Sequence, residues 1–233
     1  MTLELLNAHV GYPGIPPLVQ VDSWKASSGG LHAILGANGS GKSTLLRSVL
    51  GVIPLLEGSV RLVSNSGVCR PVDRSKWVRH VAYVASTPPS NVGLTVQEVL
   101  ELSGNSELAA SRLDRIRPWL NHRLAHLSDG QAQLVMVARA MLQSKDWIVL
   151  DEPTAFLDVK AQIELWAMLE EHVSGGGSVL MATHDLRGVH TWLSKAPADL
   201  QAKSSLSLVQ NRVLKPQAQS ASLEDLERLF AEE

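Results

Sequence analysis

The chain has 233 residues, of which 45% are hydrophobic, so it can fold around one large core. Its 21 Lys and Arg residues nearly balance 23 Asp and Glu residues, and a formal charge of −2 argues against the basic surface of a nucleic-acid-binding protein. The single cysteine, Cys69, excludes an internal disulfide, and we expect a small buried side chain there. No apolar run reaches the length of about 18 residues that a membrane span needs, and the N-terminal "MTLELLNAHV" lacks the pattern of a secretory signal.

Short apolar runs alternate with longer helical patterns along much of the chain. The runs predict buried strands that begin at Leu31, Val81, Trp147 and Ser178. The helical patterns follow Lys42, span residues 128–143 and cover about 159–173. Strands that alternate with helices predict an α/β fold with a mostly parallel sheet covered on both faces.

The segment "GANGSGKST" (36–44) follows the first of these strands and opens a helix. It matches the pattern G-x-x-x-x-G-K-[ST], in which glycines let backbone N–H groups point at phosphates and the helix N-terminus adds positive charge. Lys42 would contact the β- and γ-phosphates, and Ser43 would bind Mg²⁺. The alternative is a chance glycine-rich turn, which the flanking strand and helix disfavour. We therefore expect a nucleoside triphosphate to contact the loop residues Gly36, Asn38, Gly39, Ser40, Gly41, Lys42, Ser43 and Thr44.

Residues from about 95 to 127 break the alternation. Two helical patterns within 95–127 have no strand between them, and "TVQE" (95–98) predicts a capping box at the start of the first. We therefore predict a single domain of residues 1–233 with a helical insertion at about 87–139, and the rest of the domain comprises about 1–86 and 140–233.

The insertion ends in the stretch "LSDGQAQLVMVARAML" (127–142). Ser128 is a good N-cap, because its hydroxyl can accept from an unpaired N–H in the first turn, and Asp129 suits the positive end of the helix dipole. These residues alone fit an ordinary capped helix as well as a functional one.

The stretch "WIVLDEP" (147–153) places two acids at the carboxyl end of a buried strand, where ligands bind in open α/β sheets. Asp151 fits a magnesium-coordinating role, and Glu152 fits a general base that activates the attacking water. The alternative for both acids is an exposed strand end without function.

A histidine follows the next strand in the same way. In "ATHDL" (182–186), His184 stands at the carboxyl end of the strand that begins at Ser178, a position that favours contact with the γ-phosphate or the water. A lone histidine is usually structural. The tail "SASLEDLERLFAEE" (220–233) predicts a final amphipathic helix that docks on the domain.

Taken in chain order, these motifs resemble the nucleotide-binding subunit of ATP-binding cassette (ABC) transporters over almost the whole chain. The family's phosphate loop, signature segment, Walker B strand, D-loop and switch histidine correspond to "GANGSGKST", "LSDGQ", "WIVLDEP", "AFLD" (155–158) and His184. The resemblance implies a P-loop NTPase fold with a mostly parallel core sheet, an N-terminal antiparallel β subdomain and a helical insertion. It also implies that Tyr12, in "HVGYPG", stacks on adenine.

In this family the signature helix meets the ATP that a second subunit holds. The resemblance therefore implies that Ser128, Gly130 and Gln131 complete the ATP site of a partner cassette, with an identical chain as the expected partner. The commonest signature is "LSGGQ", so Asp129 departs from it. We expect its carboxylate to point away from the phosphates, since like charges in a dry site cost several kcal/mol.

A second departure follows the strand that begins at Val81. Family members usually carry a glutamine there, which touches the metal or the attacking water and relays the state of the transmembrane partner. Here the aligned residue is Ser86, which could bind Mg²⁺ or a water with a shorter reach. The substitution affects the expected coupling more than the ATP site.

The resemblance implies an ATPase subunit that uses ATP and Mg²⁺ to energise import through a separate permease, most like the subgroup for iron chelates, haem or cobalamin-type compounds. The expected partners are a second cassette, transmembrane permease subunits and a substrate-binding protein, and no nucleic acid. The expected location is the cytoplasmic face of the cell membrane. The alternatives are a soluble cassette ATPase in cofactor assembly or DNA metabolism, and a non-hydrolysing ATP-binding regulator.

Overall fold

The computed structural model describes residues 1–64, 67–71, 73–104, 114–143, 146–217 and 221–231. The strands are β1 (Thr2–Val10), β2 (Val19–Ser27), β3 (Leu31–Leu35), β4 (Glu57–Ser64), β5 (Gly67–Cys69), β6 (Val81–Val84), β7 (Trp147–Asp151), β8 (Ser178–Thr183), β9 (Ser205–Gln210) and β10 (Val213–Gln217). The helices are α1 (Lys42–Val49), α2 (Arg74–His80), α3 (Val96–Glu101), α5 (Asp129–Leu142), α6 (Val159–Ser174), α7 (Leu186–Lys195), α8 (Ala198–Lys203) and α9 (Leu223–Ala231), with short 3₁₀ turns at Arg117–Trp119 and Leu124–His126.

The strands form one sheet in the order β5-β4-β1-β2-β10-β9-β3-β8-β7-β6. The five strands from β9 to β6 pair in parallel, and the strands from β5 to β2 pair antiparallel. This confirms the mostly parallel core and the N-terminal antiparallel part. The two parts are continuous, because β10 pairs in parallel with β2 at Val213 and Gln20 and antiparallel with β9.

The central parallel strands are buried on both faces, as their near-continuous apolar sequences predict. Ile34 of β3, Val149 of β7 and Leu180 of β8 pack toward α1, whose Leu45 and Leu46 are completely buried. Alternate side chains on the same strands pack against α5, α6 and α7 in a second core. Each fully buried leucine side chain contributes roughly 1.5–3 kcal/mol, so burial on both faces fixes the strands that carry the site.

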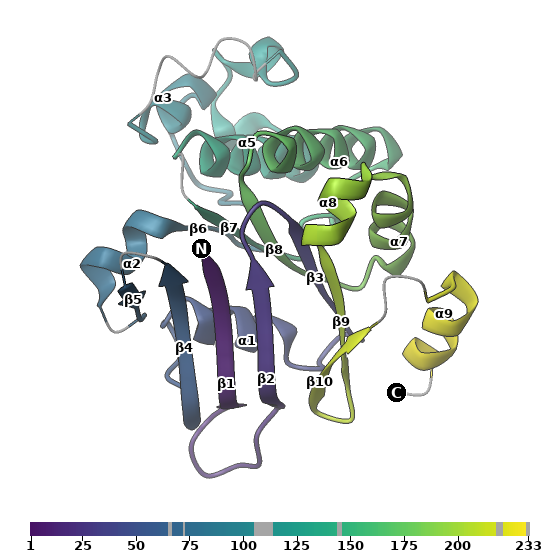
Figure 1. Ribbon diagram of the computed structural model, residues 1–233. Coiled ribbons are helices and arrows are strands. Elements are labelled where there is room, and N and C mark those ends of the chain that lie inside the picture. Colours follow the sequence, from purple (N-terminus) through teal and green to yellow (C-terminus); the bar gives the residue numbers. More distant parts are fainter. Residues whose placement is uncertain (65–66, 72, 105–113, 144–145, 218–220, 232–233) are drawn as a thin grey trace.

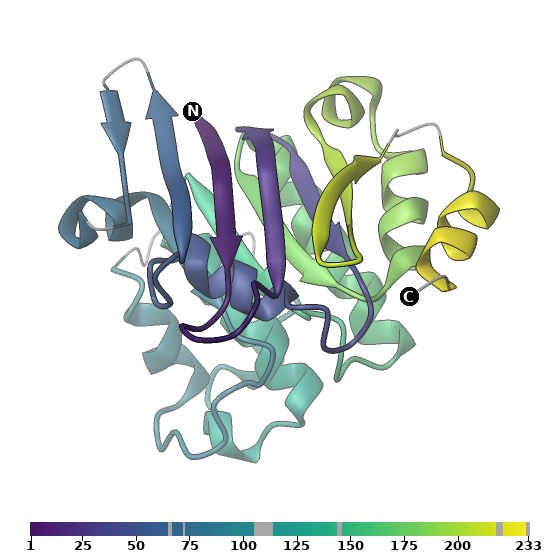
Figure 2. The ribbon, with the colours of Figure 1, turned by 90° about the horizontal axis from the view of Figure 1, so that it is seen from below.

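Helix α1 lies inside the curve of the sheet. It contacts β1 from the antiparallel part and β7 and β8 from the parallel part. Figure 2 shows α1 behind β4, β1 and β2, and Figure 1 shows α5 and α6 on the opposite side of the parallel strands. The helix that begins at the phosphate loop is therefore held between both parts of the sheet.

Cys69 differs from our expectation. It lies at the end of the edge strand β5 and is only half-buried, because β5 pairs with β4 on one side only. Its apolar character was consistent with a core position, but a three-residue edge strand offers no second layer to cover it.

The predicted insertion contains α3 and the two 3₁₀ turns. Thr95 caps α3, and both hydrogen bonds of the predicted capping box are present. The Thr95 side chain accepts from the Glu98 N–H, and the Glu98 side chain accepts from the Thr95 N–H. Much of the second predicted helical pattern falls on residues 105–113, which lie outside the described residues. The polypeptide then returns to Ser128, the N-cap of α5.

The predicted tail helix is α9, which packs beside α7 (Figures 1 and 2). Leu226 is buried, and Arg187 of α7 pairs with Glu227 at 2.9 Å. Among the helices of the described ranges, none combines the length and the apolar character needed to cross a membrane.

Candidate nucleotide site

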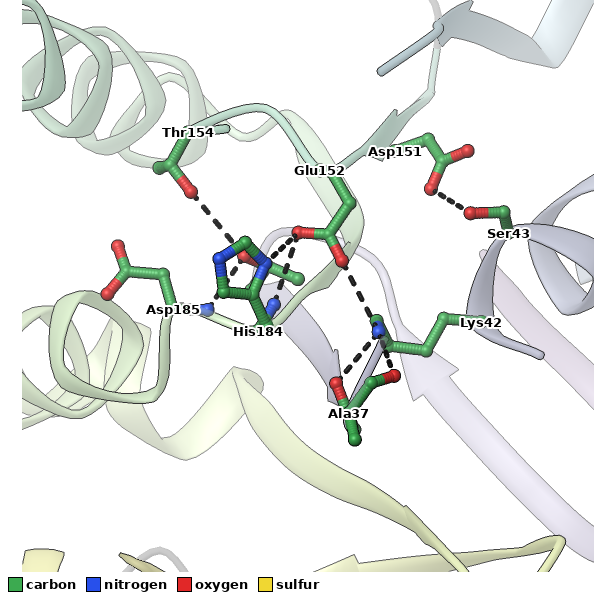
Figure 3. Close-up of polar contacts among 10 residues, drawn as sticks. Ala37, Lys42, Ser43, Asp151, Glu152, Thr154, His184 and Asp185 are labelled. Atoms are coloured by element: carbon green, nitrogen blue, oxygen red, sulfur yellow. Dashed lines mark hydrogen bonds and ion pairs between the residues drawn. The ribbon is translucent and has the colours of Figure 1, made fainter. Parts of the chain in front are cut away.

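Three neighbouring strands bring the candidate residues to one edge of the sheet. β3 ends at Leu35 before the phosphate loop, β7 ends at Asp151, and β8 ends at Thr183 before His184. The parallel register pairs Leu35 with Thr183 and Asp151 with Ala182, so the three carboxyl ends are level. Figure 3 shows the resulting group of polar side chains around Lys42 and Glu152.

The phosphate loop has the backbone that its glycines allow. Gly39 and Gly41 have φ values of 87° and 96°, in the left-handed region that disfavours other residues. A side-chain carbon on Gly41 would also lie 2.8 Å from Val19 at the start of β2. Gly36 lies against the Ser40 hydroxyl, while Asn38 is exposed and Thr44 is half-buried in α1. The loop therefore curls tightly against the end of the β1–β2 connection.

Lys42 is 4% exposed, and its ammonium group is surrounded by acceptors. Its Nζ donates to the carbonyl oxygens of Gly36 at 2.7 Å and Ala37 at 2.9 Å, and lies 3.3 Å from Glu152 Oε1. These contacts hold the charge inside the loop, where it would meet a phosphate group.

Ser43 and Asp151 form an oxygen pair beside the loop. The Ser43 hydroxyl donates to Asp151 Oδ1 at 2.8 Å, and Tyr83 of β6 donates to Oδ2 at 3.5 Å. Burial raises the pKa of the Asp151 carboxyl, and the hydrogen bond from Ser43 lowers it again. Burial also raises the pKa of the Tyr83 phenol, and the Asp151 charge adds to the increase. The charges of Arg47 and Lys42 also lower this pKa, so the buried carboxylate is stabilised by positive charge, and a bound cation would stabilise it further.

Glu152 has a φ of 45°, the left-handed conformation that non-glycine residues rarely adopt. This conformation turns its carboxylate toward the phosphate loop and the end of β8. Oε1 faces Lys42, while Oε2 lies 2.8 Å from His184 Nδ1 and accepts the His184 backbone N–H at 3.2 Å. These contacts and the hydrogen bond from the Glu152 N–H to the Ala182 carbonyl hold the strained backbone in this conformation.

The turn that carries His184 is held by its neighbours. The Thr183 hydroxyl accepts from the Asp185 N–H at 3.0 Å and lies 3.5 Å from the Thr154 hydroxyl. Asp185 in turn caps α7 by accepting from the Gly188 N–H. His184 itself is 48% exposed, so one side of its ring remains open to a ligand.

The signature segment lies elsewhere in the chain. Ser128 caps α5 by accepting from the Gln131 N–H at 3.2 Å, and Gln131 Oε1 accepts from the Ser128 N–H at 3.1 Å, while Asp129 is exposed in the first turn. A side-chain carbon on Gly130 would lie 3.1 Å from the Phe156 carbonyl oxygen, so this glycine allows α5 to approach the D-loop closely. Within the described ranges, no hydrogen bond joins these residues to the phosphate loop.

Two further candidates lie in loops. Tyr12 is 45% exposed in the β1–β2 connection, whose far end packs on Gly41. Ser86 is half-buried just after β6, and in the described part of the chain no hydrogen bond joins it to Ser43 or Asp151. Their proposed contacts with adenine and with Mg²⁺ stay predictions.

Two residues of this region were not expected from the sequence. Tyr83 reaches Asp151 because β6 and β7 pair in register, and Gln133 of α5 donates from Nε2 to the Ala85 carbonyl at 3.1 Å. The signal for Gln133 was present in the sequence, as a polar residue inside the apolar run "AQLVMVARAML".

A phosphate loop between β3 and α1, with a Walker-type aspartate at the end of β7, two strands from β3 in the sheet, defines a P-loop nucleoside triphosphatase. The sequence profile of the ABC transporter family matches residues 19–155. The chain therefore belongs to the ABC transporter family and is one of its ATP-binding, ATP-hydrolysing subunits.

Individual relatives agree with this family. The zinc import ATP-binding protein ZnuC of Ruegeria sp. (strain TM1040) is 34% identical over 192 residues, which cover 80% of this chain and 72% of that protein. The hemin import ATP-binding protein HmuV of Roseobacter denitrificans is 34% identical over 193 residues, which cover 74% of this chain and 72% of that protein. The cytochrome c biogenesis ATP-binding export protein CcmA of Bordetella bronchiseptica is 34% identical over 173 residues, which cover 70% of this chain and 75% of that protein.

A solved structure agrees over the whole chain. The ATP-binding subunit of an ABC transporter superposes with a TM-score of 0.81 at 25% sequence identity, and the match covers 99% of this chain and 100% of the other.

Proposed function

We propose that this chain energises import of a metal ion, a metal chelate, haem or a cobalamin-type compound through a separate permease. Support comes from the zinc and hemin import relatives and from the residues gathered at the carboxyl ends of β3, β7 and β8. The chain would act at the inner face of the cell membrane, with a substrate-binding protein on the other side. The observation that carries the ATPase part is the placement of Glu152 between Lys42 and His184.

The residues fit MgATP. The loop N–H groups and Lys42 would hold the phosphates, and Tyr12 would cover the adenine. The paired oxygens of Ser43 and Asp151 are the hard ligands that Mg²⁺ prefers, and Ser86 would contribute a third oxygen or hold a water. Among the described residues no cluster of three His, Cys, Asp or Glu side chains could hold a metal ion, which suits a cation that shares its ligands with phosphate. When bound, Mg²⁺ would neutralise charge on the phosphates.

Glu152 is the proposed general base. A water beside its carboxylate could give up a proton as its oxygen attacks the γ-phosphorus and the bond to the β-phosphate oxygen breaks. His184, held by the Thr183 turn, would contact the γ-phosphate or orient the water through the open side of its ring.

The second cassette is proposed to be an identical chain. Ser128, Gly130 and Gln131 lie at a helix N-terminus and make no hydrogen bond to the phosphate loop of their own chain within the described ranges, so they are available to the ATP held by a partner. Two such sites would close together, each with the phosphate loop of one chain and the signature helix of the other.

This arrangement is tested by light scattering of purified Glu152→Gln protein. The variant should be monomeric with MgADP and dimeric with MgATP, because the γ-phosphate would persist between the two chains. Adding Ser128→Arg should block dimerisation while leaving ATP binding intact, since the arginine places bulk in the shared site. A Glu152→Gln chain that binds ATP and stays monomeric would contradict an autonomous homodimer.

The second candidate function is export during cytochrome c biogenesis, favoured by the match to CcmA. Deleting the gene separates the two. Import predicts reduced uptake of labelled zinc, haem or cobalamin with normal cytochrome c content, restored by the intact gene and not by Lys42→Ala. Normal uptake of all three compounds with reduced cytochrome c would instead support the export function.

A further inference from the structure

Gln133 is a buried polar residue in the second turn of α5. It is 1% exposed, and most of the residues that flank it along the helix are buried and apolar: Ala132, Leu134, Val135 and Val137. Its Nε2 donates to the carbonyl oxygen of Ala85 at 3.1 Å, which joins residues 48 positions apart in the sequence. The bond connects α5 to the loop that leaves β6.

This amide costs stability. Within the described residues its Oε1 is buried without a hydrogen-bond partner, and an unpaired buried acceptor is unfavourable. A methionine of similar length would fill the same space without that penalty. Ala85 is exposed, so water could satisfy its carbonyl oxygen if the glutamine were replaced. The hydrogen bond is therefore dispensable for folding, which points to a role other than stability.

Both ends of the connection carry candidate functional residues. Ala85 directly precedes Ser86, and Gln133 lies five residues after Ser128, a distance of about 7.5 Å along a rigid helix. Near its start, α5 also rests on the D-loop through the close approach of Gly130 to Phe156. α5 packs against β6 as well, so its first turns are held from two sides.

We propose that Gln133 is a positioning residue that couples the loop after β6 to the signature end of α5, so that displacement of Ala85 and Ser86 moves Ser128. This inference rests on the proposed function in one respect. If the signature end of α5 meets the ATP of a partner chain, the movement of Ser128 determines how well that contact forms. The coupling itself is a property of the single chain.

The first measurement is hydrogen exchange in Gln133→Met. We expect the amides of Gln131 and Ala132, which donate to the Ser128 side chain and carbonyl, to exchange at least about tenfold faster. The thermal midpoint should stay equal or rise, because the unpartnered Oε1 is removed too. The matched control is Gln201→Met in α8, which removes the hydrogen bond from the Gln201 side chain to the carbonyl of Ala196 at the end of α7 and should leave both amides unchanged.

The second measurement is MgATP-driven dimerisation in the Glu152→Gln background. Gln133→Met should raise the dimer dissociation constant by at least about tenfold with unchanged ATP binding by the monomer, whereas Gln201→Met should have no effect. A merely structural role would lower the thermal midpoint and accelerate exchange throughout the protein, and that result would overturn the inference.

The two measurements separate the inference from the proposed function. Unchanged exchange at Gln131 and Ala132 overturns the coupling, however the chain responds to nucleotide. Faster local exchange in a chain whose Glu152→Gln parent never dimerises supports the coupling and contradicts the autonomous homodimer.

Discussion

Glu152 contacts His184 through both the ring and the backbone: Oε2 lies 2.8 Å from Nδ1 and accepts the backbone N–H at 3.2 Å. An ionised carboxylate can only accept, so this contact requires a proton on Nδ1. The other carboxylate oxygen faces Lys42 at 3.3 Å. One side chain thus connects the phosphate loop to the switch histidine, and a change in its charge alters both contacts.

Replacing Glu152 with Gln should slow ATP hydrolysis by roughly 10²-fold or more, because the amide keeps the shape and the acceptor oxygen but cannot take a proton. ATP binding should survive. The measurements are phosphate release under saturating MgATP and a nucleotide titration of the same preparation. Glu170→Gln, an exposed glutamate on α6, is the control and should hydrolyse ATP normally. Undiminished hydrolysis in Glu152→Gln would remove this residue as the base.

Lys42→Ala should weaken MgATP binding and abolish turnover. The substitution removes the ammonium group that Gly36, Ala37 and Glu152 hold inside the loop, while the helix and strands around it remain. Calorimetric titration with MgATP tests the loss of binding, and a far-ultraviolet circular dichroism spectrum tests whether the fold is intact. Lys160→Ala, an exposed lysine on α6, should bind as the unmodified chain does. Tight MgATP binding by folded Lys42→Ala protein would contradict the assigned site.

Asp129→Gly restores the commonest signature and should change ATPase activity by less than about tenfold, an effect below about 1.4 kcal/mol. The reason is that Asp129 is exposed in the first turn of α5, where a carboxylate interacts well with the helix dipole, and we expect it to point away from the partner's phosphates. Steady-state ATPase rates measure the change. A much larger loss would mean that the acid takes part in the reaction.

Stability should depend on pH through His32. This residue of β3 is 2% exposed, with Nδ1 2.8 Å from the Ser205 hydroxyl and Nε2 2.8 Å from the Ser27 carbonyl, and burial lowers its pKa to about 4. Between pH 6.5 and about 4 the unfolded chain binds a proton that the folded chain does not, so acidification favours unfolding. The contribution of neutral His32 to the free energy of unfolding is fully present above about pH 6.5. About 3 kcal/mol of that free energy is lost as the pH falls to about 4.

The test is urea unfolding of the wild type and of His32→Gln between about pH 7 and about pH 4.5. Glutamine can bond to the same two oxygens and does not titrate, so the variant should show a flatter dependence of the free energy of unfolding on pH. His190→Gln, a half-buried histidine of α7, is the control. Parallel curves for the wild type and His32→Gln would contradict the assignment.

The fold and the positions of several candidate site residues in it could be predicted because each depends on local sequence. The apolar run ending in Asp151 already determines a buried strand with an acid at its ligand end, and the glycines at 39 and 41 already determine a curled loop. The capping role of Ser128 could likewise be predicted, because it depends only on the Ser128 side chain and on the spacing to Gln131.

The features that the sequence did not predict depend on contacts between distant segments of the chain. Gly130 was interpreted as a backbone donor to phosphate, whereas its missing side chain also lets α5 approach Phe156. Tyr83 reaches Asp151 only through the register of β6 on β7. Cys69 is half-buried because β5 is an edge strand, and an apolar pattern does not reveal which strand is at the edge.

The position of β3 in the sheet also has a consequence for biosynthesis. Both of its hydrogen-bonded neighbours, β8 and β9, come from the last quarter of the chain. While the ribosome is translating the first three quarters, the strand that leads into the phosphate loop has no partner, and its apolar side chains stay accessible to chaperones and proteases. A transcript truncated before β8 would therefore yield a polypeptide that contains the whole phosphate loop sequence and cannot assemble the strand that supports it.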